Sequence, residues 1–419
     1  MSENCKVCFS RRDFLQAGAG SVAAMLFSNY SNLLLAQDKT AVAARSRAKA
    51  CIVLWMGGGP SHIDTFDPKP GQDTGGPFKP LETAAKEIQI GEHLPRVARM
   101  MHRISVVRSM SHAEGAHERA TFLLQTGHMQ NPAIDYPGSG AIVASEVGET
   151  LDIPNYVAIG GGAHGPGFLG VDHFPYSIGN PESALKELQQ TAEGVKRSVL
   201  LDELNKHFDE GHESANNVKR ASFYDKIRKL LDSKFSGSID LSKEADELKT
   251  EYGKNRFGLG CLMARRLVET GVKFVQVNSG GWDTHQDNFN RTKKNLESVD
   301  PGFATLVKDL DSKGLLESTI VLWMGEFGRT PRINGNEGRD HYPRAFCAAM
   351  AGGGIHGGRV IGATDAKGAN VAGEKTSVGD LLATIYGQFG IDLNKKYYHP
   401  KTGVVKITEG GKPIKGLIE

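Results

Sequence analysis

The sequence has almost no excess of charge of either sign. Its 419 residues contain 50 Lys and Arg against 48 Asp and Glu, a formal net charge of +2. Proteins that hold nucleic acids by their phosphates need a concentrated basic surface. The balanced composition therefore gives no electrostatic case for nucleic acid as a partner.

Cysteine is scarce as well, with five residues in the chain. Cys5 and Cys8 form a CxxC pair, but no second pair lies nearby to complete a zinc site. The remaining three are an odd number, and Cys51 and Cys347 lie inside apolar runs typical of strands. We expect these two to be buried thiols, and we expect no disulfide framework.

Long hydrophobic runs are also missing, so we predict no stable membrane span. The N-terminus instead has the layout of an export signal, with a twin-arginine pattern at Ser10–Leu15, a small apolar run at Ala17–Phe27 and Ala36 at its end. We predict a twin-arginine signal peptide over residues 1–36 and a polar linker over 37–48. The Tat export machinery would then be a partner, and the mature protein would be periplasmic or secreted. The alternative is an ordinary amphipathic first helix.

What the sequence has in quantity is glycine, 51 residues, many of them directly after apolar runs. Three such runs, Cys51–Met56, Phe274–Asn278 and Thr319–Met324, have the length and β-branched content of buried strands, and each continues into glycine and ionisable residues. In open α/β sheets, ligands bind outside the carboxyl ends of the strands. One site at the strand ends is therefore expected.

Strand and helix patterns alternate along the chain, which favours an α/β domain with a mainly parallel central sheet and helices on both faces. We assign that domain to residues 49–419. Charged, helix-favouring residues dominate 181–255, which we interpret as a helical insertion or cap. Expected strands lie at 50–56, 104–109, 156–159, 273–278, 319–324 and 346–350, and one expected helix at 301–313.

Acidic residues and histidines follow two of these strands. Asp283 and His285 are two residues apart, Asp340 and His341 are adjacent, and Glu326 lies at the end of another strand. Such groups are ligands for divalent ions such as zinc, manganese or calcium. We predict a metal site of one or two ions.

Arg329 lies in the same stretch as Glu326 and would pair with a tetrahedral oxyanion. A pair of ions would clamp the attacking and leaving oxygens of a phosphate or sulfate ester. We therefore predict that Arg329 binds the acidic group of such a substrate.

The turn after the first strand supplies Ser61 as a candidate nucleophile, and His62 and Asp64 as further candidate ligands. In the alternative interpretation, Asp64 merely caps a helix. A second polar cluster (His112, Glu114, His117 and Glu118) follows the second strand. We expect at least one member to face the site, and we name His117 as a catalytic candidate.

Five motifs in order carry a family resemblance. They are the twin-arginine start, Gly57-Gly-Gly-Pro-Ser-His-Ile-Asp64, Gly281-Trp-Asp-Thr-His285, Met324-Gly-Glu-Phe-Gly-Arg-Thr-Pro331 and Gly338-Arg-Asp-His-Tyr-Pro343. From about residue 10 onward the chain resembles an exported bacterial family, numbered 1501 among the domains of unknown function. That family is grouped with alkaline phosphatases and sulfatases. The resemblance implies an alkaline phosphatase-like fold and a metal-dependent site at its strand ends.

The stretch from Leu94 to Gly127 is similar to the sulfatase segment that carries the nucleophile, except at one position. Sulfatases have a modifiable Cys or Ser four residues before the arginine matched by Arg119, and here Gly115 stands there. The nucleophile stays open between Ser61, Ser111, Thr121 and a metal-bound hydroxide.

Together these features predict an exported sulfatase- or phosphatase-like metallohydrolase. Its substrate would be a sulfate or phosphate ester of a small molecule or a glycan. One alternative is a non-catalytic periplasmic binding or scaffold protein that retains the fold, which Gly115 favours. The other is a metal-assisted isomerase or mutase.

Overall fold

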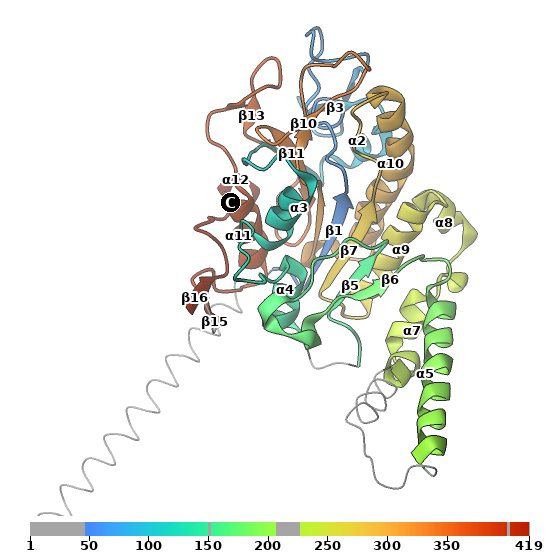
Figure 1. The fold of residues 1–419 in the computed structure, drawn as a ribbon. Coiled ribbons are helices and arrows are strands. Elements are labelled where there is room, and N and C mark those ends of the chain that lie inside the picture. Colours follow the sequence, from blue (N-terminus) through green and yellow to red (C-terminus); the bar gives the residue numbers. More distant parts are fainter. Residues whose placement is uncertain (1–46, 150–151, 207–226, 400–402, 419) are drawn as a thin grey trace, which may run out of the picture. The chain divides into compact units, whose positions relative to one another are not determined.

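The central sheet has eight strands in the order β12-β4-β11-β8-β1-β7-β5-β6 (Figure 1). The computed structural model describes residues 47–149, 152–206, 227–399 and 403–418. The predicted signal peptide and residues 37–46 of the predicted linker lie outside these ranges. Within them, Arg47–Glu419 forms one compact unit.

Strand β1 occupies the middle of the sheet between β7 and β8 and is parallel to both. Only β11 runs antiparallel to its neighbours, β4 and β8. The prediction of a mainly parallel α/β sheet is confirmed. The strands are β1 (Ala50–Met56), β4 (Ile104–Met110), β5 (Tyr156–Ile159), β6 (Tyr176–Ile178), β7 (Phe274–Ser279), β8 (Thr319–Met324), β11 (Phe346–Ala351) and β12 (Val360–Ile361).

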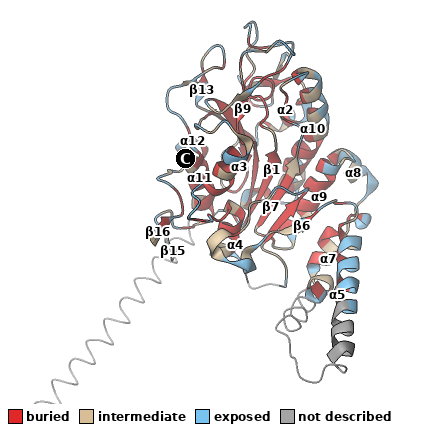
Figure 2. Ribbon diagram, viewed as in Figure 1, coloured by how far each residue is buried: buried red, intermediate tan, exposed pale blue. Residues whose placement is uncertain are grey.

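Both faces of the sheet are buried, which explains why its strands are continuous apolar runs rather than alternating ones. All seven residues of β1 are buried (Figure 2). Ile52 and Leu54 belong to one hydrophobic cluster, and Cys51 and Val53 belong to another on the opposite face. The expected buried thiols Cys51 and Cys347 are confirmed as free and buried.

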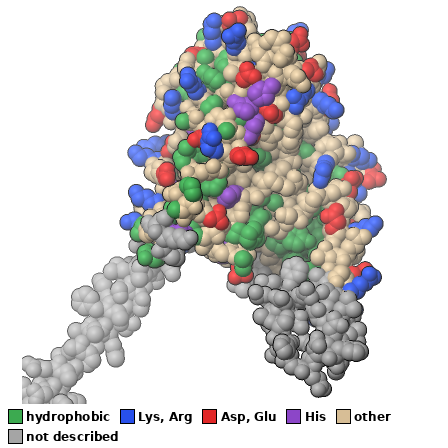
Figure 3. Space-filling model, in the orientation of Figure 1, with side chains coloured by type: hydrophobic (Ala, Val, Ile, Leu, Met, Phe, Trp, Pro, Cys, Tyr) green, Lys and Arg blue, Asp and Glu red, His purple; other side chains and the backbone are tan. Residues whose placement is uncertain are grey.

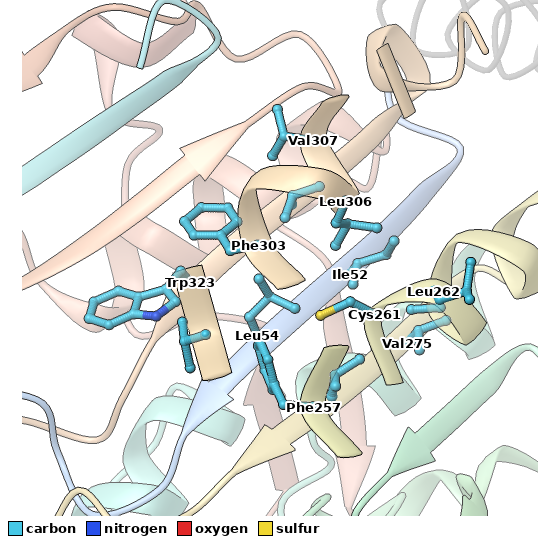
Figure 4. Close-up of a cluster of buried hydrophobic side chains, with 14 of the residues drawn as sticks. Ile52, Leu54, Phe257, Cys261, Leu262, Val275, Phe303, Leu306, Val307 and Trp323 are labelled. Carbon is cyan, nitrogen blue, oxygen red and sulfur yellow. The ribbon is translucent and has the colours of Figure 1, made fainter. Parts of the chain in front are cut away.

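Helices α2 (Pro95–Met100), α9 (Arg256–Glu269) and α10 (Asn288–Ser312) contribute to the first cluster. Phe257 and Cys261 of α9 and Phe303 of α10 lie around Ile52 and Leu54 (Figure 4). Helices α3 (His117–Thr126), α4 (Ser139–Val147) and α11 (Val378–Gln388) supply the second cluster. Helices therefore cover both faces, as predicted.

Helix α10 begins well before the predicted start of residue 301. Proline is common in the first turn of a helix and uncommon in its interior. In the structure Pro301 lies inside α10, and the polar segment before it is helical. Leu296 and Val299 are buried on the same helix, so tertiary packing rather than local composition sets its start.

The described part of 181–255 includes helices α5 (Ala184–Lys206), α7 (Lys234–Ile239) and α8 (Asp246–Tyr252), and residues 227–232 are helical as well. Their role as an insertion or cap remains a prediction. A search of the described residues for a helix long and apolar enough to cross a membrane found none.

The polar loops meet at one edge of the sheet because of strand direction. Parallel strands β1, β7 and β8 all end there, so the segments that follow them lie close together. Strand β11 is reversed, so the segment that precedes it reaches the same edge. That segment includes β10 (His341–Tyr342), which pairs with β9 (Gly328–Arg329).

A buried ion pair fastens this segment to the loop after β1. The guanidinium of Arg339 donates to both carboxylate oxygens of Asp64, at 2.8 and 3.1 Å, and neither side chain is exposed. Its remaining donors reach the carbonyls of Thr74, Thr330 and Pro331. A bidentate pair with every donor used fixes the position of the segment.

We expect Asp64→Ala to lower the free energy of unfolding by about 3–5 kcal/mol, because it leaves a buried guanidinium without its counter-charge. Denaturant unfolding followed by circular dichroism measures this change. In the control, Asp73→Ala removes an exposed pair with Lys367 and should cost less than about 1 kcal/mol. Equal losses in the two variants would contradict the assigned role of Asp64.

Candidate metal centre

The site gathers side chains from four separate segments. Asp283 and His285 follow β7, Glu326 follows β8, His117 is the first residue of α3, and His341 lies in β10. Figure 3 shows histidine and acidic side chains gathered together on the displayed face. Segments far apart in the sequence thus supply one polar cluster.

The Oδ1 atom of Asp283 is the centre of the cluster. It lies 3.3 Å from Nε2 of His117, 3.1 Å from Nε2 of His285 and 3.3 Å from Nε2 of His341. The ligand atoms of His117, Asp283 and His341 all lie within 4.8 Å of one another. The Nε2 of His285 also lies 2.9 Å from that of His341. Asp283 and the three histidines are called the Asp283 cluster below.

Two buried polar atoms in the site have no hydrogen-bond partner among the described residues. They are Nε2 of His117 and Oε2 of Glu326. The contact of His117 Nε2 with Asp283 is close in distance but does not have hydrogen-bond geometry. An unpaired nitrogen and an unpaired carboxylate oxygen are both suited to a cation.

Arg329 is fully buried and makes four hydrogen bonds. It donates to the carbonyls of Gly58, Gly59 and Arg339, and to Oδ1 of Asp283 at 2.6 Å. Burial disfavours the charged form of Asp283, but Arg329 outweighs it and lowers the pKa of Asp283 to about 2. The structure therefore places Arg329 as the residue that holds Asp283 in its ionised form.

The histidines of the cluster experience different surroundings. The hydrogen bond to Glu326 raises the pKa of His117. Burial lowers the pKa of His341, so its neutral form is favoured. The hydrogen bond from His285 lowers the pKa of Asp340. Neutral imidazoles and ionised carboxylates are the forms that bind metals.

The loop after β1 does not join the cluster. Asp64 is occupied by Arg339 and by Asn288, which donates to Oδ2 at 2.8 Å. Buried His62 donates from Nε2 to the carbonyl of Gly368 at 2.8 Å. The Oγ of Ser61 accepts the backbone N–H of Asp64 and is also buried. Backbone groups of Gly58 and Gly59 in this loop form hydrogen bonds with Glu326 and Arg329.

The second polar cluster divides between two roles. His117 enters the site, while His112 donates from Nε2 to the backbone carbonyl of Glu326 at 2.7 Å. Glu114 accepts from Nε of Arg119 at 2.6 Å. Spacing in the sequence did not distinguish His117 from the other members of this polar cluster.

One contributor was missed from the sequence. The backbone carbonyl of Gly115 accepts a hydrogen bond from Nδ1 of His341 at 2.8 Å. Every residue has a carbonyl, so no residue type marks this contact in a sequence. Gly115 is also exposed, and a Cβ added there would meet no atom within 4 Å.

The donor set fits a divalent ion. Three imidazoles and a carboxylate offer nitrogen and oxygen ligands, and imidazole suits zinc and related transition metals. The carboxyl groups of Asp283, Glu326 and Asp340 all interact with the guanidinium of Arg329. The cluster can therefore hold a metal.

Several solved structures resemble the fold weakly. The lipoteichoic acid synthase LtaP from Listeria monocytogenes is 8% identical with a TM-score of 0.38, over 87% of this chain and 75% of its own. The PsFucS1 sulfatase from Pseudoalteromonas sp. is 11% identical with a TM-score of 0.37, over 85% and 72%. Alkaline phosphatase from the Antarctic bacterium TAB5 is 12% identical with a TM-score of 0.29, over 75% and 95%. Similarities at this level carry no argument about activity.

No curated protein matches the sequence. The family model described as "Protein of unknown function (DUF1501)" matches residues 48–418, nearly all of the part that the structure describes. The motifs that carried the resemblance after the signal region all lie within this range. The chain belongs to the DUF1501 family.

Proposed function

We propose that this protein is an exported, metal-dependent hydrolase of a sulfate or phosphate ester. One observation carries the proposal: three imidazole nitrogens lie within 3.3 Å of one carboxylate oxygen at the carboxyl edge of the sheet. Export rests on the twin-arginine pattern, which lies outside the described residues. The substrate would be a small molecule or a glycan that carries the ester.

In this proposal His117, Asp283 and His341 hold the ion, with His285 as a fourth donor. A divalent ion there would polarise an ester oxygen and stabilise the negative charge that develops on it. Arg329 keeps Asp283 ionised and in place.

Water is the proposed nucleophile. Ser61 is buried and accepts a backbone N–H, so its hydroxyl does not reach the cluster surface. Gly115 provides no side chain at the position where sulfatases have theirs, and the space beside it is open. Water can enter there, where the Nδ1 of His341 contacts the Gly115 carbonyl.

The same observation at Gly115 favours a second candidate function. A binding or scaffold protein that has lost the nucleophile would also have glycine there and would keep the Asp283 cluster. Both candidate functions predict that the protein binds a metal, but only the hydrolase predicts that it turns over an ester.

We expect the protein to bind zinc or a related ion. Asp283→Ala and His341→Ala should each weaken metal binding by more than about 100-fold, because mutating residues that only hydrogen-bond to metal ligands already lowers metal affinity by about 10- to 100-fold. Competition titration against a chromophoric chelator measures the affinity. His102→Ala removes an exposed histidine that contacts the carbonyl of Arg99 and serves as the control. Wild-type affinity in the Asp283 variant would refute the metal centre.

We expect the metal-loaded protein to hydrolyse an aryl sulfate or aryl phosphate ester. In Asp283→Ala, kcat/KM should fall by about 100-fold or more, because the variant would lose the ion together with its ligand. Release of the phenol is followed by absorbance, with Asp73→Ala as the control. A metal-loaded protein that hydrolyses neither class would favour the binding candidate.

A further inference from the structure

A second cavity lies beside helix α3. It has a volume of about 290 Å³ and lies between the segment that carries Asp135 and residues 164–174. None of its lining residues belongs to the Asp283 cluster. The cavity is called the Phe174 pocket below, after the aromatic ring on its wall.

The apolar part of the pocket wall is open to water. Phe174 is 59% exposed and Val171 is 76% exposed, although most large hydrophobic side chains of the described residues are buried. A Cβ added at Gly165 would lie 3.4 Å from the ring of Phe174, so the ring rests on the backbone of that glycine. Covering an exposed aromatic ring of this kind with a ligand is favourable.

The polar part of the wall offers hydrogen-bond acceptors. The Nε2 of His164 lies 2.9 Å from the carbonyl oxygen of Tyr136, which can only accept, so Nε2 carries the proton of the neutral ring. The Nδ1 of His164 is then an acceptor, and it has no hydrogen-bond partner within the described segments. The carboxylate of Asp135 is exposed and likewise has no partner there. A ligand with hydroxyl donors can satisfy both groups.

The loop that carries His164 is held in place by its neighbours. Gln125 of α3 and Gln276 of β7 both donate to the carbonyl of Gly162, at 2.8 and 3.1 Å. The ring of His164 packs edge-on against Phe122 of α3, with ring centroids 5.1 Å apart. The pocket is therefore formed before a ligand arrives, which lowers the entropy cost of binding.

Helix α3 connects the pocket to the Asp283 cluster. His117 is the first residue of this helix, and Phe122 lies five positions later. At about 1.5 Å per residue, these two positions are about 7.5 Å apart along the helix axis. A ligand of oligosaccharide length can therefore reach from the cluster to the pocket.

Other classes of ligand fit the pocket poorly. The carboxylate of Asp135 repels a phosphate or sulfate group, and an acyl chain would bury that carboxylate without a partner. A protein partner needs a far larger contact area than a cavity of this size offers. A sugar ring has a face of C–H groups that packs on an aromatic ring, and hydroxyl groups at its edge that donate to acceptors. An uncharged sugar ring therefore matches both parts of the wall.

We propose that the Phe174 pocket is a metal-independent binding site for an uncharged sugar ring. Phe174 stacks on the sugar, and Asp135 and His164 accept from its hydroxyl groups. Resting on the proposed function, the bound ring is part of a glycan whose esterified unit lies at the Asp283 cluster. The substrate class is then a glycan rather than a small molecule.

The test measures the binding of uncharged tetrasaccharides of glucose, galactose and N-acetylglucosamine to the full chain in the presence of EDTA, by saturation-transfer NMR and calorimetry. We expect at least one to bind the wild type. Phe174→Ala should weaken that binding by about tenfold, because the aromatic surface that the sugar covers is lost. Tyr398→Ala removes an even more exposed aromatic side chain outside the pocket and should leave the affinity unchanged. Thermal unfolding checks that both variants fold.

Failure of every tetrasaccharide to bind, or equal affinity in the wild type and Phe174→Ala, would overturn the sugar site. A Phe174→Ala variant that converts a dimer to a monomer in analytical ultracentrifugation would also overturn it, because the exposed ring would then belong to an interface between copies of this chain. These outcomes leave the metal-dependent hydrolase in place. Conversely, a wild type that binds the sugar but no metal would keep the sugar site and refute the proposed function, together with the role of the sugar as part of its substrate.

Discussion

The contact between Asp283 and three imidazole nitrogens is the constraint on which the site depends. Electron-rich atoms in such proximity are stable only if a proton or a cation lies among them. Buried Arg329 forms an ion pair with the carboxylate of Asp283 from the side of the core and keeps that carboxylate ionised. The histidines approach from the solvent side, where His285 and Asp283 are both nearly half exposed. A cation can therefore reach the cluster from water.

The fold brings these groups together through strand direction and one buried ion pair. The parallel strands β7 and β8 end at the same edge, and the reversed strand β11 brings the Arg339–His341 segment to it. The Asp64–Arg339 pair then anchors that segment against the loop after β1. Buried pairs of this kind contribute little net stability relative to apolar residues but impose a definite geometry. Here the geometry places His341 opposite His117.

Much of this arrangement could be predicted from the sequence. Six of the eight strands were predicted because a sheet covered on both faces needs continuous apolar runs, and their polar ends indicated where the site lies. The short edge strands β6 and β12 were missed. The roles of single residues were harder to infer. Asp64 and His62 have the residue types of ligands, yet their partners are Arg339 and Gly368, which are remote in sequence. The residue types in the sequence cannot predict that the Gly115 carbonyl accepts a hydrogen bond from His341, or which ring nitrogen of each histidine faces Asp283.

X-ray absorption spectroscopy of the zinc-loaded wild-type chain tests the central claim most directly, because it reports which atoms surround the ion. The account predicts nitrogen and oxygen neighbours at about 2.0–2.1 Å with the outer-shell scattering of at least two imidazole rings. A shell of oxygens alone, without imidazole scattering, would contradict it, because the ion would then lie away from the histidines that surround Asp283.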